Sequence, residues 1–249
     1  MPSPSSRRAA ATVSQVAESP TVEREPRGAR RKRETRMRLM DAALRLMAEN
    51  GMEGVAVNEI TELADVGFGS FYNHFESKEA IHAAVADWVF EEFADRLDRL
   101  TAELADPAEV VAVCVRHTLL RARAEPVWGR FLLREAYSAR AMSRGLGRRL
   151  WRDIQRGIKD GRFDVSDPFL SFIAVGGAAL AAIATDLEFG KVLGDEAARL
   201  RNLGFDVRDM PERTATEALT VLGVDRVEAH EIANRALPKG SVTAADGSI

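Results

Sequence analysis

The sequence predicts an all-α protein. Apolar residues recur at steps of three or four over most of the 249 residues, which is the pattern of amphipathic helices. Glycine and proline interrupt these stretches at helix-length intervals. The alternating, β-branched runs that mark half-buried strands are not seen. We therefore expect roughly nine or ten helices.

The N-terminal half contains four of the expected helices. The first has an apolar stripe over 37–47 and ends at Gly51, a helix stop. Two short helices follow, near 57–64 and 68–75. One long amphipathic helix then begins near Ser77, and its apolar residues recur mostly at steps of four.

The C-terminal half continues the helical pattern. A stripe over 110–117 belongs to a helix that is broken at Pro126, and another stripe covers 146–158. Pro168 follows an aspartate, an N-cap with proline at the first helical position, and opens a helix rich in Gly and Ala. The last clear apolar face lies over 211–222.

Charge is distributed unevenly. The net charge is −3, but 27–38 holds seven basic residues against one acidic residue, a local +6 that leaves −9 for the rest. This asymmetry suggests a polyanion at one end, although a solvated tail explains it equally well. Because 1–30 lacks an apolar period, we expect a disordered basic arm there, and 238–249 is expected to be a loose tail.

The composition favours a cytoplasmic protein. Cys114 is the only cysteine, so no intrachain disulfide can form, and this fits a reducing compartment. Residues 1–17 lack the apolar run of a signal peptide. The charge-free stretch 169–185 is at the short limit for a membrane span and is rich in Gly and Ala. We interpret it as a buried helix and expect no membrane association.

The two short helices near 57–75 are separated by a tight turn at 65–67, the arrangement of a helix-turn-helix. Phe71 and Phe75 lie four residues apart and can both face inward. The other residues of the second helix then lie nearer the outside. Among them, Asn73 can in principle read adenine in a major groove.

Ten residues at fixed spacing carry a resemblance: Ile60, Ala64, Val66, Gly69, Phe71, Tyr72, His74, Phe75, Ser77 and Lys78. This pattern resembles the DNA-binding helix-turn-helix of the TetR-type (tetracycline-repressor family) transcriptional regulators. The resemblance implies a DNA-binding domain over 31–84 and a ligand-binding and dimerisation domain over 85–237. It implies a double-stranded DNA operator as partner, with contacts from Arg33, Arg36, Asn58, Gly67, Phe68, Gly69, Ser70, Tyr72, Asn73, His74 and Lys78.

Four positions depart from the family pattern, and one of them is Thr61, which stands where Ala is usual. Ala56 stands where the family usually has a capping Thr, so either Asn58 caps the first helix of the motif or that end frays. Asp65 stands where Gly is usual, and Gly67 where Ser is usual. These changes affect individual contacts and not the expected fold.

The C-terminal domain is expected to form a homodimer through the helix at Pro168 and the helix over 211–222, although a core helix within a monomer is the alternative. A pocket for an apolar or aromatic effector is expected between helices, and plain core is the alternative for each of its residues. The predicted lining is Cys114, His117, Trp128, Phe131, Leu132, Tyr137, Trp151, Phe169 and Phe172.

The sequence thus predicts a transcriptional repressor that a small-molecule ligand releases from DNA. The alternative is a ligand-independent DNA-binding or protein-interaction module. None of the four histidines belongs to an H-E-x-x-H pair, and Walker and G-x-S-x-G motifs are missing. We therefore expect no enzymatic activity, no cofactor and no metal site.

Overall fold

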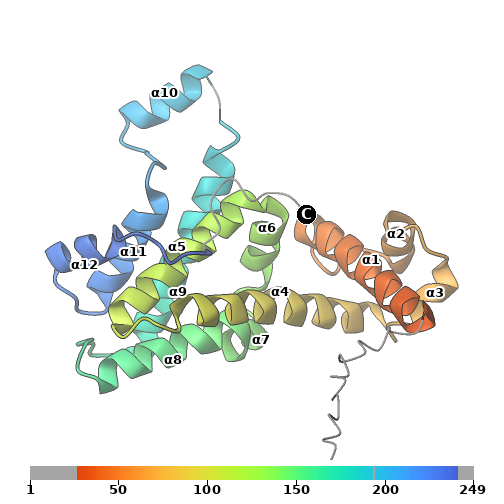
Figure 1. Cartoon of the computed structure of the whole chain (residues 1–249). Coiled ribbons are helices and arrows are strands. Elements are labelled where there is room, and N and C mark those ends of the chain that lie inside the picture. The colour runs from red at the N-terminus through yellow and green to blue at the C-terminus, as the bar shows by residue number, and fades with distance from the viewer. Residues whose placement is uncertain (1–26, 193, 241–249) are drawn as a thin grey trace, which may run out of the picture.

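A computed structural model describes residues 27–192 and 194–240 of the chain. Within these ranges the chain forms twelve α-helices and no strand, which confirms the all-α prediction (Figure 1). The helices are α1 (Arg27–Asn50), α2 (Val57–Leu63), α3 (Phe68–Tyr72), α4 (Lys78–Thr101), α5 (Pro107–Ala124), α6 (Pro126–Glu135), α7 (Ala139–Ser143), α8 (Gly145–Lys159), α9 (Pro168–Phe189), α10 (Gly194–Asn202), α11 (Met210–Val221) and α12 (Arg226–Ala233).

The helices form two lobes. Helices α1 to α3 make a small N-terminal lobe, and α5 to α12 make a larger C-terminal lobe (Figure 1). The long helix α4 runs from one to the other, and its N-terminus is capped by Ser77, whose hydroxyl accepts from the Ala80 amide at 3.2 Å. Helix α4 therefore connects the two lobes, which also meet where α6 packs on α1.

Helices α6, α7, α10 and α12 were not among the elements expected from the sequence. Pro126 illustrates why, because it ends α5 and also occupies the first position of α6, where proline is well tolerated. Helix α1 begins at Arg27, inside the arm predicted to be disordered. The rest of that arm, and most of the predicted loose tail, lie outside the described residues.

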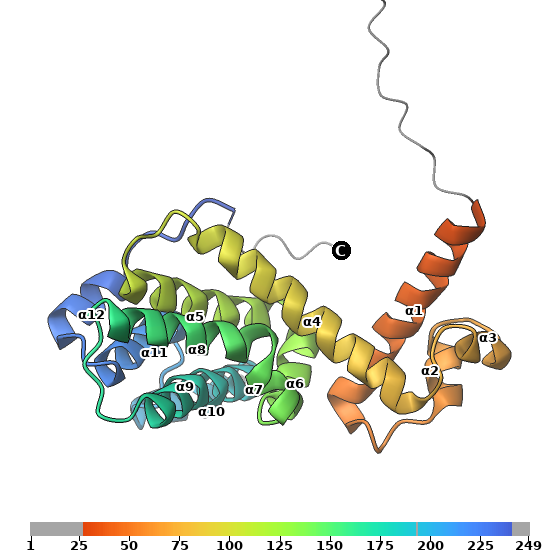
Figure 2. The same ribbon diagram turned by 90° about the horizontal axis from the view of Figure 1, so that it is seen from below.

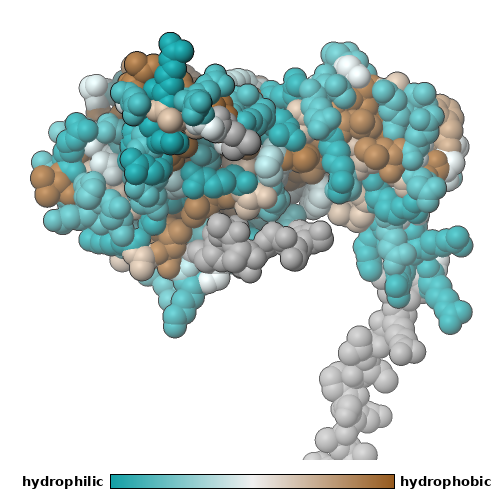
Figure 3. Space-filling model, turned by 90° about the horizontal axis from the view of Figure 1, so that it is seen from above, coloured by the Kyte–Doolittle hydropathy of each residue, from teal (hydrophilic) through white to brown (hydrophobic). Residues whose placement is uncertain are grey.

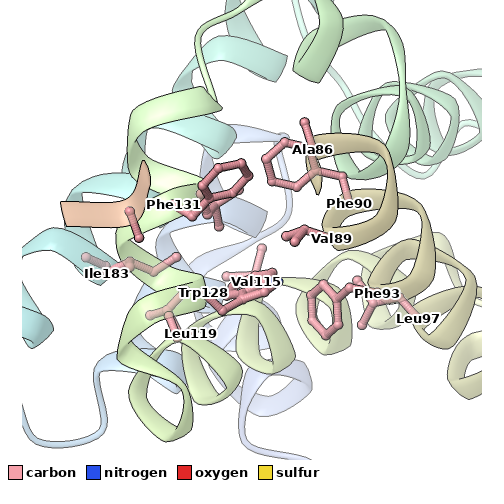
Figure 4. Close-up of a cluster of buried hydrophobic side chains, with 14 of the residues drawn as sticks. Ala86, Val89, Phe90, Phe93, Leu97, Val115, Leu119, Trp128, Phe131 and Ile183 are labelled. Atoms are coloured by element: carbon pink, nitrogen blue, oxygen red, sulfur yellow. The ribbon is translucent and has the colours of Figure 1, made fainter. Parts of the chain in front are cut away.

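The core is continuous through both lobes. Phe71 and Phe75 are buried in the N-terminal lobe, as the helix-turn-helix pattern predicts. In the C-terminal lobe, α5 packs against α4, α6, α8, α9, α11 and α12. Aromatic contacts join α4 to α6: Phe93 lies edge-on to Trp128, and Phe90 lies 6.0 Å from Phe131 between ring centroids (Figure 4).

The Gly/Ala-rich helix α9 is less buried than the sequence suggested. It is long and apolar enough to cross a membrane by those criteria alone, yet only 22% of its apolar window is buried inside the chain. Phe169 and Leu170 are exposed. Helix α11 lies beside α9, as expected, and packs on α5, α9 and α12 through its buried residues, while its Val221 is exposed. The exposed apolar face is thus contributed mainly by α9.

Candidate nucleic-acid interface and effector cavity

The turn before α3 is held in a specific conformation. Asp65 has a φ of +50°, a left-handed conformation that aspartate tolerates better than most residues. Arg38 of α1 donates to the Asp65 carbonyl at 2.7 Å and lies 3.0 Å from its carboxylate. Gly67 then occupies the N-cap of α3 in an extended conformation. This explains how aspartate replaces the glycine usual at this position.

The glycines of α3 are not required by packing within the chain. A Cβ built on Gly67 or Gly69 would meet no other atom within 4 Å, and neither residue has a positive φ. Both residues are exposed. Since nothing inside the protein demands a missing side chain there, the glycines suit the close approach of something outside.

Exposed aromatic side chains flank the glycines. Phe68 and Tyr72 are 54% and 53% exposed, and their rings meet edge-on at a centroid distance of 5.7 Å. Asn73, at the C-cap of α3, is also exposed. The outward surface of α3 therefore carries flat apolar groups and polar groups together, a combination suited to a macromolecular partner.

A basic cleft lies between α1 and α3. The N-terminal half of α1 projects past α3 (Figure 2), and hydrophilic side chains gather on it at the lower right of the space-filling view (Figure 3). The lining residues are Gly28, Arg31, Lys32, Thr35, Ser70, Asn73 and His74. Two cations and several hydrogen-bonding groups thus face one open space beside α3.

Ser70, Asn73 and His74 are the predicted DNA contacts that line this cleft, and four other predicted contacts lie outside both the cleft and α3 with its N-cap. Arg36 is half-buried: it donates to the His74 carbonyl at 2.9 Å and stacks on the Phe75 ring at 4.1 Å. It therefore positions the end of α3 and is not an outward contact. Asn58 and Arg33 are exposed on α2 and α1, and Lys78 is half-buried at the start of α4.

The cap of α2 was missed by sequence reasoning. The Ala56 amide donates to the carboxylate of Glu59 at 2.7 Å, so the glutamate satisfies the N-terminus from within the helix. Asn58 provides no cap. Its carbonyl accepts instead from the hydroxyl of buried Thr61 at 2.9 Å. The signal available in the sequence was a glutamate three residues after the N-cap.

A cavity of about 150 Å³ lies in the C-terminal lobe. Helices α4, α5, α8 and α9 surround it, with the end of α6 and the segment that leads into α7 closing one side. Most lining side chains are apolar, among them Leu97, Leu150 and Ile183. An apolar cavity of this size has room for about one benzene-sized molecule.

The lining of this cavity differs from the predicted pocket. Cys114, Leu132, Tyr137 and Phe172 line it, and its low-polarity surroundings raise the pKa of the Cys114 thiol. The other predicted residues lie elsewhere: His117, Trp128, Phe131, Trp151 and Phe169. The first three are fully or almost fully buried in the core, and the last two are exposed at the surface of α8 and α9.

Three charged residues that sequence reasoning missed, Asp98, Arg149 and Asp153, also line the cavity. Arg149 of α8 donates to Asp98 at 2.6 Å and to Glu91 at 2.8 Å, and it also pairs with Asp95, all on α4. Burial acts to raise the pKa of Asp98, but hydrogen bonds from Arg152 and Arg149 outweigh it and keep the pKa below its usual value.

Asp153 is in a different electrostatic state. It is only 7% exposed, and burial raises the pKa of its carboxyl despite a 2.9 Å hydrogen bond from Arg152. It lies four residues after Arg149, beside Ile154 at the edge of the apolar stripe over 146–158. A carboxylate next to such a stripe was the available signal. The cavity thus combines apolar walls with hydrogen-bond acceptors on one side.

Among the residues that the structure describes, no group of three or more His, Cys, Asp or Glu side chains could hold a metal ion. The carboxylates that gather beside the cavity form ion pairs with arginine: Glu91 and Asp98 with Arg149, and Asp153 with Arg152.

Two family models match the chain. The model described as "Bacterial regulatory proteins, tetR family" matches residues 39–85. The model described as "Tetracyclin repressor-like, C-terminal domain" matches residues 106–235, which is 130 of the 249 residues. The first match contains the turn and α3, and the second contains most of the cavity.

Curated relatives match a part of the chain. The HTH-type transcriptional repressor DhaR of Mycobacterium sp. (strain GP1) is 40% identical over 78 residues, 31% of this chain and 37% of that protein. The HTH-type transcriptional repressor KstR of Mycolicibacterium smegmatis is 33% identical over 72 residues, 29% of this chain and 35% of that protein. The matches span little more than a third of each relative.

A solved structure is similar over most of this chain. RolR in complex with its ligand resorcinol is 34% identical and superposes with a TM-score of 0.61, covering 86% of this chain and 100% of that one. RolR without ligand superposes with a TM-score of 0.58 at 33% identity. The similarity therefore includes the cavity-bearing lobe as well as the N-terminal lobe.

Proposed function

This chain belongs to the TetR family of bacterial regulatory proteins, and we propose that it is a dimeric, sequence-specific DNA-binding repressor released by a small aromatic ligand. The main support is that one helix, α4, connects the DNA-binding lobe to the cavity. Helix α4 begins at the lobe that presents α3 and also lines the cavity at Phe90, Leu97 and Asp98. The relatives DhaR and KstR are repressors, which supports repression and not activation.

The N-terminal lobe is the DNA-binding part of the proposal. With Gly67 and Gly69 lacking side chains, α3 can approach the edge of a duplex closely, and Asn73 lies where it can read a base. The cleft lined by Arg31 and Lys32 can hold the adjoining phosphate strand, with His74 on its other side. Base reading and backbone binding then come from neighbouring elements.

The salt dependence of binding tests the role of the cleft. We expect the double variant Arg31→Gln, Lys32→Gln to reduce the slope of log K against log salt by roughly four units, since each phosphate contact contributes about 0.9 and the dimer would lose two contacts from each protomer. Anisotropy titrations at several salt concentrations measure this. The control is Arg45→Gln, which removes a cation from the same helix that pairs with Asp41 at 2.9 Å. Equal slopes for wild type and the double variant would remove the cleft from the interface.

DNA binding is expected to strengthen as pH falls through the range of histidine. Burial, and then the charges of Lys32 and Arg36, lower the pKa of His74, so it is neutral at pH 7 in the free protein. A bound phosphate would raise that pKa, so binding would take up a proton at pH values between the pKa of the free protein and that of the complex. We expect His74→Gln to flatten this part of the pH profile. The same pH profile in wild type and in His74→Gln would contradict the placement of His74 at the phosphate.

The cavity is the effector site of the proposal. Its volume of about 150 Å³ suits a single aromatic ring. Asp98 and Asp153 can accept hydrogen bonds from hydroxyl groups, whereas they would repel a ligand carboxylate. The ligand class that fits is an uncharged phenol. The resorcinol found in the related RolR structure belongs to this class.

A homodimer fits the exposed side of α9. Apart from Asp186 and Glu188 near its end this helix carries no charged side chain, and Phe169 and Leu170 are 59% and 63% exposed. Pairing α9 with α9 of a second copy would cover this face and place two α3 helices for the two half-sites of an operator. The protein would act in the cytoplasm, where its DNA is, as a regulator without catalytic activity.

Selection of bound duplexes from random DNA tests the function directly. The expected product is an inverted repeat, with half-sites related by the two-fold axis of the dimer. Addition of resorcinol or related phenols to the selected complex should then release the DNA. Enrichment of no common sequence would reject the specific regulator, and enrichment without release by any single-ring phenol would reject the effector class.

A further inference from the structure

Two consecutive residues at the end of α6 hold the N-terminal lobe. Arg134 donates from Nε to the Ala48 carbonyl at 2.8 Å and from Nη2 to the Glu49 carbonyl. The carboxylate of Glu135 lies 2.9 Å from Nε2 of His82 on α4. One residue therefore contacts α1, and the next contacts the start of α4.

The carbonyls that Arg134 binds are the unpaired ones at the end of α1. The last turn of a helix leaves its carbonyls without intrahelical partners and carries a partial negative charge. Helix α1 has no basic residue of its own in that turn. Arg134 therefore supplies, from the C-terminal lobe, the cation and the donors that this helix end lacks.

The same segment lines the cavity. Leu132, Ala136 and Tyr137 line the cavity. Of the residues that lie among them in the sequence, Arg134 contacts α1 and Glu135 contacts the start of α4. A change in the position of the cavity wall therefore cannot leave the α1 contact untouched unless the backbone over these six residues deforms.

We propose that Arg134 is a positioning residue that couples occupancy of the cavity to the orientation of the DNA-binding lobe. A lobe attached through α4 alone can pivot about that helix, and the packing of α6 on α1, together with the Arg134 hydrogen bonds, provides a second attachment that limits this freedom. Ligand in the cavity displaces the end of α6, and Arg134 carries the displacement to α1 and hence to α3. This inference rests on the proposed function.

Helix α6 supplies a matched control one turn earlier. Arg130 also reaches α1, but only through an ion pair with the Glu49 carboxylate at 3.9 Å, and such partly exposed pairs contribute little. Arg130→Gln removes the same charge from the same helix without touching the α1 carbonyls. Arg134→Lys keeps the charge but cannot reproduce the fork that binds two carbonyls.

The experiment measures the coupling factor, the ratio of DNA dissociation constants with and without saturating resorcinol, in the full-length protein. For Arg134→Gln we expect this factor to fall by about tenfold, the equivalent of one charge-assisted hydrogen bond. Resorcinol affinity without DNA should change little, because Arg134 does not line the cavity. Arg134→Lys should be intermediate, and Arg130→Gln should resemble wild type.

A wild-type coupling factor in Arg134→Gln would overturn the inference, as would an equal loss in Arg130→Gln. If Arg134→Gln does not fold, Arg134→Lys decides the matter, since a wild-type factor there would show that the bidentate grip is unnecessary. Failure of wild type itself to bind DNA, or to release it with resorcinol, would instead refute the proposed function. The two failures are therefore distinguishable.

Discussion

Gly69→Glu is expected to abolish specific DNA binding while the protein remains folded. The new side chain enters open space in the free protein, where a Cβ at position 69 meets no atom within 4 Å. Glutamate is a better helix former than glycine by up to about 1 kcal/mol, and a negative charge is favourable in the first turn of a helix. Against a duplex the same side chain meets phosphates at close range, and we expect a loss of roughly a thousandfold or more.

The measurement pairs operator anisotropy with thermal unfolding. Gly69→Ala separates size from charge, since it adds only a methyl group to the same exposed position. We expect an intermediate loss of affinity and an unchanged or slightly raised melting temperature. An operator affinity near that of wild type in Gly69→Glu would show that α3 does not face the DNA.

Asp153→Asn is expected to weaken effector binding while DNA binding remains. The carboxylate is 7% exposed and lines the cavity, so it is placed to accept from a phenolic hydroxyl. Asparagine keeps an acceptor oxygen but loses the charge, and a hydrogen bond to a charged group exceeds a neutral one by about 1–1.5 kcal/mol, so phenol affinity should fall by roughly 5- to 12-fold. Calorimetric titration with resorcinol measures this loss directly.

Stability provides the check on Asp153→Asn. Because burial raises the pKa of this carboxyl, its ionised form opposes folding, and stability contributed by the group is lost as pH rises through that pKa. The amide should therefore leave the melting temperature at pH 7 unchanged or raised. Asp160→Asn, at the exposed end of the same helix, is the control. Unchanged resorcinol affinity in Asp153→Asn would remove this residue from the effector site.

The helix-turn-helix could be predicted because its defining contacts are local. Phe71 and Phe75 lie one turn apart, and their inward orientation follows from helical periodicity alone. The role of Arg36 could not be predicted in the same way. Its partner, the His74 carbonyl, is 38 residues away, so an exposed-looking cation in a basic segment is in fact used to hold α3 in place.

The lining of the cavity was harder to predict than the exposed surface of α3, for a physical reason. Aromatic residues are large enough to fill space, so Trp128 and Phe131 close the core between α4 and α6 and do not border a void. The polar side of the cavity depends on which residues of α8 meet α4. Pairing of Arg149 with Asp98 joins residues 51 positions apart, and a single sequence does not specify that register.

In the proposed function, effector binding in the cavity and operator binding at α3 weaken each other. Linkage requires that resorcinol weaken operator binding by the same factor by which operator weakens resorcinol binding. Measuring both dissociation constants, each with and without the other ligand at saturation, tests this most directly. We expect the two dissociation constants to change by equal factors, in the range of about 5 to 150. Simultaneous binding of operator and resorcinol with neither affinity changed would contradict it.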